Sequence, residues 1–194
     1  MKMFNYFAYG SNMLTERLRN RCPSAQPIGI AIANGYGLEF VKRSMDHSGK
    51  ATLIKGDGPG RQAYGVLYEI ENEDLADLDK AEGKGSGYNR IDDFRVKLFA
   101  DGKQVQAKTY IASPEAIDTG LKPYDWYQAL VIQGAVQNKL AEEYIDSLCN
   151  FTSIIDPKPD RKTRKKAIEA LVRAGVKDFT QILKGTTEMK KPAL

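Results

Sequence analysis

Residues 6–14, YFAYGSNML, contain the first groups that could do chemistry. An aromatic run typical of a β-strand breaks at Gly10, Ser11 and Asn12 and continues at once into the helical pattern MLTERLRNR. A strand that leads directly into a helix presents the first main-chain N–H groups of that helix without partners. With the helix dipole behind them, these donors form a small site for a carboxylate or an oxyanion. The alternative is ordinary helix capping by Ser11 or Asn12.

Glu82 is the second candidate. In the helical pattern that begins at Asn72, the spacing i, i+3, i+7 places Leu75, Leu78 and Glu82 on the face that packs against the core. Burial disfavours the charged form of a carboxyl group, which suits a group that exchanges a proton near neutral pH. The alternative is a carboxylate that reaches solvent from the last turn before Gly83, or that pairs with a cation.

Several tyrosines could line a pocket, because a phenol combines an apolar ring with one directed hydrogen bond. These are Tyr9, Tyr88, Tyr110 and Tyr127. The sequence does not support a catalytic nucleophile activated by a histidine. The single histidine, His47, lies in the polar stretch SMDHSGK, and neither cysteine has a Cys-x-x-Cys context. With so few soft ligands we expect reduced thiols, no metal and no cofactor.

Five or six short strands are expected around these residues. They fall within residues 5–10, 27–43, 51–54, 61–70 and 88–112, with a two-residue hairpin turn at Asp101-Gly102. Short strands with tight turns favour a curled antiparallel or mixed sheet over a stack of βαβ units. Helical patterns follow at residues 72–82, at 124–151 as two helices or one kinked helix, and at 165–184 in two pieces.

Length and composition indicate one globular domain with an appendage. The chain has 194 residues, of which 42% are hydrophobic and 28% charged. It has no apolar run near the roughly 18 residues of a membrane span and no apolar signal segment, so we expect a cytoplasmic protein. Residues 151–194 carry 11 Lys and Arg against 5 Asp and Glu. This basic tail is either a solvated helical face, which we favour, or a contact for phosphate, RNA or acidic lipid.

Three motifs in order resemble the γ-glutamylcyclotransferase family. YFAYGSNML matches its Tyr-Gly-Ser-Asn turn after the first strand, and LDKAEGKGSGYNRI matches its Leu-Asp-x-x-Glu-Gly segment followed by Tyr. PYDWYQALVIQGAVQNKLAEEYIDSL is similar to its Tyr-started helix with Gly-Ala in the middle. The resemblance spans residues 4 to about 150. It departs at residues 139–141, Lys-Leu-Ala, where relatives often have Gly-Leu-Pro, and it ends after CNF.

The resemblance implies an α+β fold, a small mixed and mostly antiparallel β-barrel flanked by helices, with the active site at the mouth of the barrel. Residues 1–150 would form the catalytic domain and residues 151–194 a basic helical extension. Family members release an amine from a γ-glutamyl amide as 5-oxoproline forms, an acyl transfer that belongs to glutathione metabolism. Carried over by position, Glu82 is the general acid/base, and the substrate-binding residues are Tyr6, Tyr9, Gly10, Ser11, Asn12, Tyr88, Tyr110 and Tyr127.

The expected partner is a small γ-glutamyl amino acid or γ-glutamyl amine. Other leaving groups are alternatives: glutathione, γ-glutamyl-ε-lysine or an aminoglycoside intermediate. Asn12 fits the amino-acid and antibiotic-type subgroups better than the glutathione group, which commonly has leucine there. A non-catalytic ligand-binding member of the fold is a further alternative. No metal, membrane or nucleic-acid partner is expected despite the basic tail, and a homodimer is left open.

Overall fold

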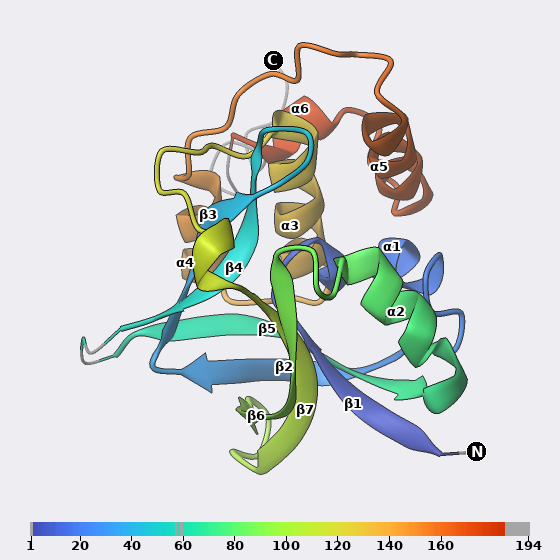
Figure 1. Cartoon of the computed structure of the whole chain (residues 1–194), viewed down its shortest axis with the longest axis vertical. Coiled ribbons are helices and arrows are strands. Elements are labelled where there is room, and N and C mark those ends of the chain that lie inside the picture. The colour runs from blue at the N-terminus through green and yellow to red at the C-terminus, as the bar shows by residue number, and fades with distance from the viewer. Residues whose placement is uncertain (1, 57, 59, 185–194) are drawn as a thin grey trace.

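The computed structural model describes residues 2–56, 58 and 60–184. Five strands of the described chain form a closed barrel, in the order β1, β5, β2, β6, β7 (Figure 1). Their bounds are β1 Met3–Ala8, β2 Gln26–Asn34, β5 Gln62–Glu71, β6 Tyr88–Leu98 and β7 Gln104–Ala112. Neighbours pair antiparallel, except that β1 and β7 are parallel and close the barrel. The predicted small, mixed, mostly antiparallel barrel is confirmed.

Strands β3 (Tyr36–Arg43) and β4 (Gly49–Lys55) form a separate antiparallel ribbon outside the barrel. The described chain therefore has seven strands in two sheets, where the sequence predicts five or six in one. The ribbon lies beside helix α3, and the ring of Phe40 packs edge-on against that of Tyr127 with centroids 6.1 Å apart. This packing brings residues of β3 and β4 to the mouth of the barrel.

The β6–β7 hairpin is present, but its loop is longer than predicted. Gly102 has a φ of +73°, which fits the expected turn residue. However, β6 ends at Leu98 and β7 begins at Gln104, and the N–H of Gly102 donates to the carbonyl of Leu98. The two-residue turn is therefore wrong, because the strands separate before the turn residues are reached.

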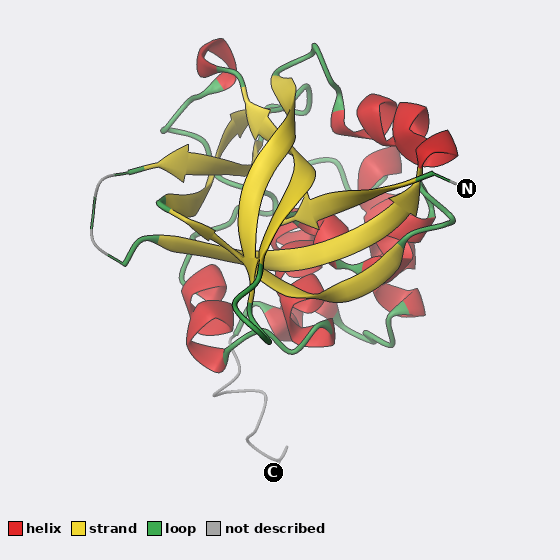
Figure 2. Cartoon of the chain, turned by 90° about the horizontal axis from the view of Figure 1, so that it is seen from below, coloured by secondary structure: helices red, strands yellow, loops and turns green. Residues whose placement is uncertain are grey.

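The described chain has six α-helices, most of which gather at one end of the barrel (Figures 1 and 2). They are α1 Thr15–Arg19, α2 Leu75–Glu82, α3 Asp125–Gln137, α4 Glu142–Cys149, α5 Lys162–Arg173 and α6 Phe179–Ile182. Three short 3₁₀ turns accompany them: η1 Ser11–Met13, η2 Asn72–Asp74 and η3 Pro114–Ala116. Residues 124–151 thus form two helices. No helix of the described chain is both long and apolar enough to cross a bilayer.

Helix α3 is the central helix of this layer. It packs against η1, α4, α5 and α6, and it is buried on nearly every side, as expected for a helix whose apolar residues do not follow one stripe. Gly134 allows the closest contact: a Cβ atom there would lie 2.6 Å from the main-chain nitrogen of Leu14 and 2.7 Å from Cβ of Met13. α3 therefore holds the turn at residues 10–14 in place.

The C-terminal segment joins this helical layer through Asp156. Its buried carboxylate accepts a hydrogen bond from Nε1 of Trp126 at 2.9 Å and forms an ion pair with Nε of Arg161 at 2.8 Å. Ala167 and Leu171 of α5 are buried in the same core as α3. The division into residues 1–150 and 151–194 stays a prediction.

Candidate active site

The turn after β1 differs from the expected helix start. Residues Ser11–Met13 form a single 3₁₀ turn, and α1 begins only at Thr15. In the described chain neither turn is capped by a side-chain hydrogen bond, so capping by Ser11 or Asn12 is wrong. The physical reason is that Leu14 takes an extended conformation at the position where the cap would lie.

Unpaired main-chain donors are nevertheless present in this turn. The N–H of Met13 donates to the carbonyl of Gly10 at 3.0 Å, whereas the N–H groups of Ser11 and Asn12 reach no acceptor in the described part of the protein. Gly10 packs closely here, because a Cβ atom on it would lie 3.1 Å from Cβ of Ala51. The donors therefore belong to a tight turn and not to the end of a long helix.

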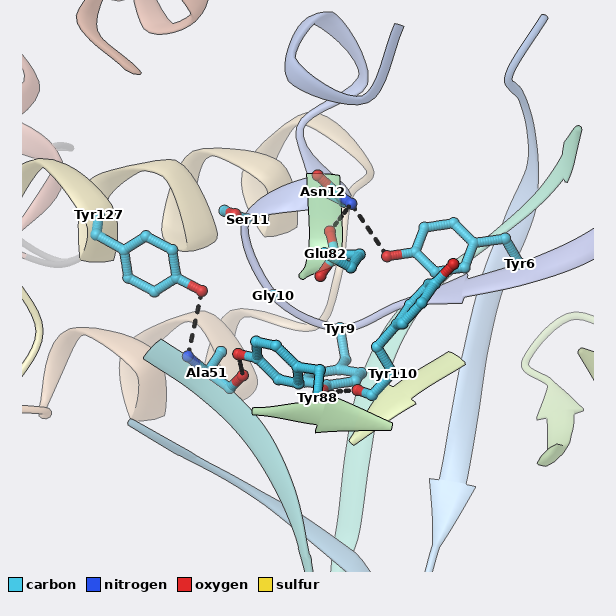
Figure 3. Close-up of a pocket in the computed structure, with 10 residues that line it drawn as sticks. All are labelled: Tyr6, Tyr9, Gly10, Ser11, Asn12, Ala51, Glu82, Tyr88, Tyr110 and Tyr127. Atoms are coloured by element: carbon cyan, nitrogen blue, oxygen red, sulfur yellow. Dashed lines mark hydrogen bonds between the residues drawn. The ribbon is translucent and has the colours of Figure 1, made fainter. Parts of the chain in front are cut away.

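A small cavity of about 30 Å³ lies beside this turn at the mouth of the barrel (Figure 3). Its walls come from β1, the η1 turn, β4, α2, β6, β7 and α3. The lining residues are Tyr6, Tyr9, Gly10, Ser11, Asn12, Ala51, Glu82, Tyr88, Tyr110 and Tyr127. The structure thus brings together all nine residues that the sequence singles out, and Ala51 joins them. Their individual roles stay predictions.

Glu82 is the last residue of α2, which ends because Gly83 adopts a left-handed φ of +67°. Its side chain is 18% exposed and lines the cavity. Oε1 accepts from Nδ2 of Asn12 at 2.6 Å and from Nη1 of Arg21 at 2.8 Å. Both sequence alternatives therefore hold in part, since Glu82 faces the cavity and also pairs with a cation. Oε2 accepts from no described residue, which leaves it available to a bound molecule.

Arg21 also fixes the orientation of Asn12. Its Nη1 lies 2.9 Å from Oδ1 of Asn12, so the amide nitrogen of Asn12 must point the other way. That nitrogen contacts Oη of Tyr6 at 3.1 Å as well as Glu82. Sequence reasoning missed Arg21, because only the folded chain brings the end of α1 to the end of α2.

Phenol groups form the rest of the wall. Oη of Tyr88 donates to the carbonyl of Ala51 at 2.6 Å, and Oη of Tyr127 accepts from the N–H of Ala51 at 3.2 Å. Tyr9 donates to the carbonyl of Tyr110. Burial raises the pKa of Tyr9, Tyr88 and Tyr127, so these phenols are neutral at physiological pH. Ala51 has no chemical group that a sequence pattern could have marked.

Asp79 contacts one of the phenols in this wall, that of Tyr110. Its Oδ1 accepts from Oη of Tyr110 at 2.7 Å. Its Oδ2 forms an ion pair with Nη1 of Arg90 at 2.6 Å. The contact positions the ring of Tyr110 at the cavity.

A larger, open cleft of about 550 Å³ adjoins the cavity. It shares Ser11, Glu82, Tyr88 and Tyr127 with the cavity, so these four residues mark the boundary between the two spaces. Its outer walls come from α1, the β3–β4 ribbon and the start of α5. The C-terminal segment therefore contributes to the cleft. In residues 2–184, apart from 57 and 59, no cluster of three or more His, Cys, Asp or Glu side chains could hold a metal.

The fold and the cavity define a small β-barrel protein with a pocket at the barrel mouth, and the pattern of the AIG2-like family matches residues 62–148 of the chain. The gamma-glutamylcyclotransferases of Bos taurus and Homo sapiens are 32% and 30% identical to the chain, and each match covers 89% of both chains. A solved gamma-glutamyl cyclotransferase superposes with a TM-score of 0.76 at 29% identity, covering 87% of this chain and 99% of its own. The chain belongs to the γ-glutamylcyclotransferase family, a family of enzymes, as its three sequence motifs predict.

Proposed function

We propose that the protein converts a γ-glutamyl amino acid into 5-oxoproline and a free amino acid, with Glu82 as general acid/base. The observation that carries this proposal is the free Oε2 of Glu82 in a cavity bounded by neutral phenols and by two unpaired main-chain donors. The names of the relatives support the same reaction class. Cys22 and Cys149 form no disulfide, which favours a reducing, cytoplasmic location for this enzyme.

The enzyme has two tasks in this reaction: to hold the substrate in a bent conformation and to transfer one proton. The α-amine of the glutamyl group attacks its own γ-carbonyl carbon, a five-membered ring closes, and the bond to the leaving nitrogen breaks. Because nucleophile and target are tethered, orientation supplies an effective concentration of about 10⁵–10⁸ M. A covalent enzyme nucleophile is therefore unnecessary.

Glu82 moves the proton in this scheme. An α-amine has a reference pKa of about 7.7–8.0, so much of it is protonated at neutral pH and cannot attack. Oε2 of Glu82 accepts a proton from the amine and returns one to the leaving nitrogen. Such catalysis contributes roughly 10²- to 10⁴-fold. Asn12 and Arg21 keep Oε1 occupied, which directs Oε2 toward the substrate.

The turn and the tyrosines position the substrate. The N–H groups of Ser11 and Asn12 hold the α-carboxylate or the oxygen that becomes negative as the ring closes. The rings of Tyr9, Tyr88 and Tyr127 limit access of water to the reacting amide. The leaving amino acid lies in the open cleft, because the boundary residues Ser11 and Tyr88 face both spaces.

A panel of γ-glutamyl amino acids assayed for both products tests this function. We expect one 5-oxoproline for each amine released. Release of the amine together with free glutamate would show hydrolysis and overturn the cyclisation. Absence of turnover with every compound, in protein shown to be folded, would favour a non-catalytic role.

A further inference from the structure

The open cleft beside the cavity is strongly cationic. Among the described residues, seven Lys and Arg side chains line it against two carboxylates, those of Asp46 and Glu82. A concave surface lined by charges of one sign concentrates molecules of the opposite sign. The cleft therefore attracts anionic groups.

Three of these cations already have carboxylate partners. Arg21 pairs with Glu82 at 2.8 Å, and Lys50 pairs with Asp46 at 2.9 Å. Arg161 pairs with Asp156, outside the cleft lining, at 2.8 Å. Lys80 and Lys162 are exposed, so water solvates and screens their charges. Two cations remain.

Arg17 and Lys42 are these two cations. Neither has a carboxylate oxygen at ion-pair distance in the described chain. Arg17 uses Nε to contact Oγ of Ser11 at 3.0 Å, and Nζ of Lys42 lies 4.7 Å from the ring centroid of Tyr88. Since Ser11 and Tyr88 are boundary residues, the two cations stand at the point where a substrate leaves the cavity and enters the cleft.

Lys42 is buried in this position, and only 9% of its surface is exposed. A Cβ atom on Gly87 would lie 2.9 Å from Cε of Lys42, so the absence of a side chain there leaves room for the lysine stem. Burial lowers the pKa of Lys42 and lowers that of Arg17 to about 9, which leaves Arg17 charged at pH 7. A buried charge without an anionic partner is costly, and a bound carboxylate would offset that cost.

We propose that the cleft selects γ-glutamyl compounds whose leaving amino acid carries a side-chain carboxylate, with Arg17 and Lys42 as the residues that determine this preference. The inference rests on the proposed function. An acidic leaving amino acid offers an α-carboxylate and a second carboxylate, which matches two cations. A polycationic leaving group, such as an aminoglycoside, would meet repulsion from the same residues.

The test compares γ-glutamyl-glutamate with γ-glutamyl-glutamine, which share shape and differ by one charge. We expect kcat/KM to be at least about tenfold higher for the acidic compound. Lys42→Met should reduce this ratio to about 1–3, whereas Lys42→Arg should retain most of it. Lys103→Gln, which removes an exposed charge from the β6–β7 hairpin outside the cleft, should leave it unchanged. Should Lys42→Met fail to fold, Arg17→Gln serves as the second variant.

The proposal would be overturned if the wild-type kcat/KM for γ-glutamyl-glutamate were equal to or lower than that for γ-glutamyl-glutamine. It would also be overturned if Lys42→Met left the ratio of the two values unchanged. Calorimetry with Glu82→Gln separates the cleft from catalysis, because binding of the same two compounds is measured without turnover. Tighter binding of γ-glutamyl-glutamate, lost on adding Lys42→Met, is the expected result. Equal affinities would overturn this inference whatever the outcome of the 5-oxoproline assay, and lack of turnover with preserved binding would overturn only the proposed reaction.

Discussion

The side-chain nitrogen of Asn12 lies 2.6 Å from Oε1 of Glu82, although 70 residues separate the two in the chain. Arg21 completes a triangle with them, at 2.8 Å from Glu82 and 2.9 Å from Asn12. The triangle joins the turn after β1, the end of α1 and the end of α2. One oxygen of Glu82 is thereby held, and the other is left to the cavity.

Replacing Glu82 by glutamine should abolish most activity. The amide keeps an oxygen that can accept from Asn12 and Arg21, but it cannot accept and return a proton. We expect kcat for 5-oxoproline release to fall at least about a hundredfold. Asp77→Asn, an exposed carboxylate on the same helix, is the matched control and should retain full activity. Wild-type turnover in Glu82→Gln would rule out the proposed acid/base.

Arg21 should matter for the orientation of Glu82 and Asn12. Arg21→Gln removes the charge and the shared donor, so we expect kcat to fall about tenfold or more and the free energy of unfolding to fall by about 1 kcal/mol. Arg21→Lys keeps the charge but has no planar fork, and an intermediate loss is expected. Steady-state kinetics and urea unfolding measure the two effects. If both variants match the wild type in kcat, the triangle has no part in catalysis.

Gly134 should not tolerate alanine. In most helices this substitution stabilises by about 0.5–1 kcal/mol. Here the added Cβ would lie 2.6–2.7 Å from atoms of Met13 and Leu14, so we expect a net loss of about 1–3 kcal/mol and reduced activity from a displaced turn. Gly29→Ala, whose Cβ would meet nothing within 4 Å, should change stability by less than about 0.5 kcal/mol. A stabilised Gly134→Ala would contradict the close contact between α3 and η1.

Asp156 should contribute stability that disappears in acid. Burial alone would raise its pKa, but hydrogen bonds from Arg161, the N–H of Lys158 and Trp126 lower the pKa to about 2. A lowered carboxyl pKa stabilises the fold above the ordinary value near 3.8, and this contribution is lost as pH falls through 2. The ionised carboxylate of Asp156 contributes about 2 kcal/mol to the free energy of unfolding.

Unfolding of wild type and Asp156→Asn, measured between pH 7 and pH 2, tests this contribution. The stability difference should be largest above pH 4 and should shrink below it, because the wild-type carboxylate becomes protonated. Asp160→Asn, an exposed neighbour, serves as the comparison. A difference that does not depend on pH would mean that the charge of Asp156 does not hold the C-terminal segment.

Local patterns in the sequence predict most elements of the fold. The strand–turn–helix pattern near Gly10, the helix that ends at Gly83 and the two helices after Tyr124 all occur where the residues indicate. Alternation, helical spacing and glycines with positive φ act over a few residues, so they can be recognised without knowledge of the fold. The errors concern the cap of α1, the length of the β6–β7 loop and the separation of β3 and β4 from the barrel.

The sequence by itself determined which groups are available: one carboxylate on a helix face, a glycine turn with spare N–H donors, and several phenols. Only the tertiary structure decided which partners those groups meet. Arg21 beside Glu82, Asp79 behind Tyr110, and Arg17 with Lys42 at the cleft all join segments far apart in the chain. The physical reason is that such contacts depend on how helices and strands pack against one another, and no local periodicity carries that information.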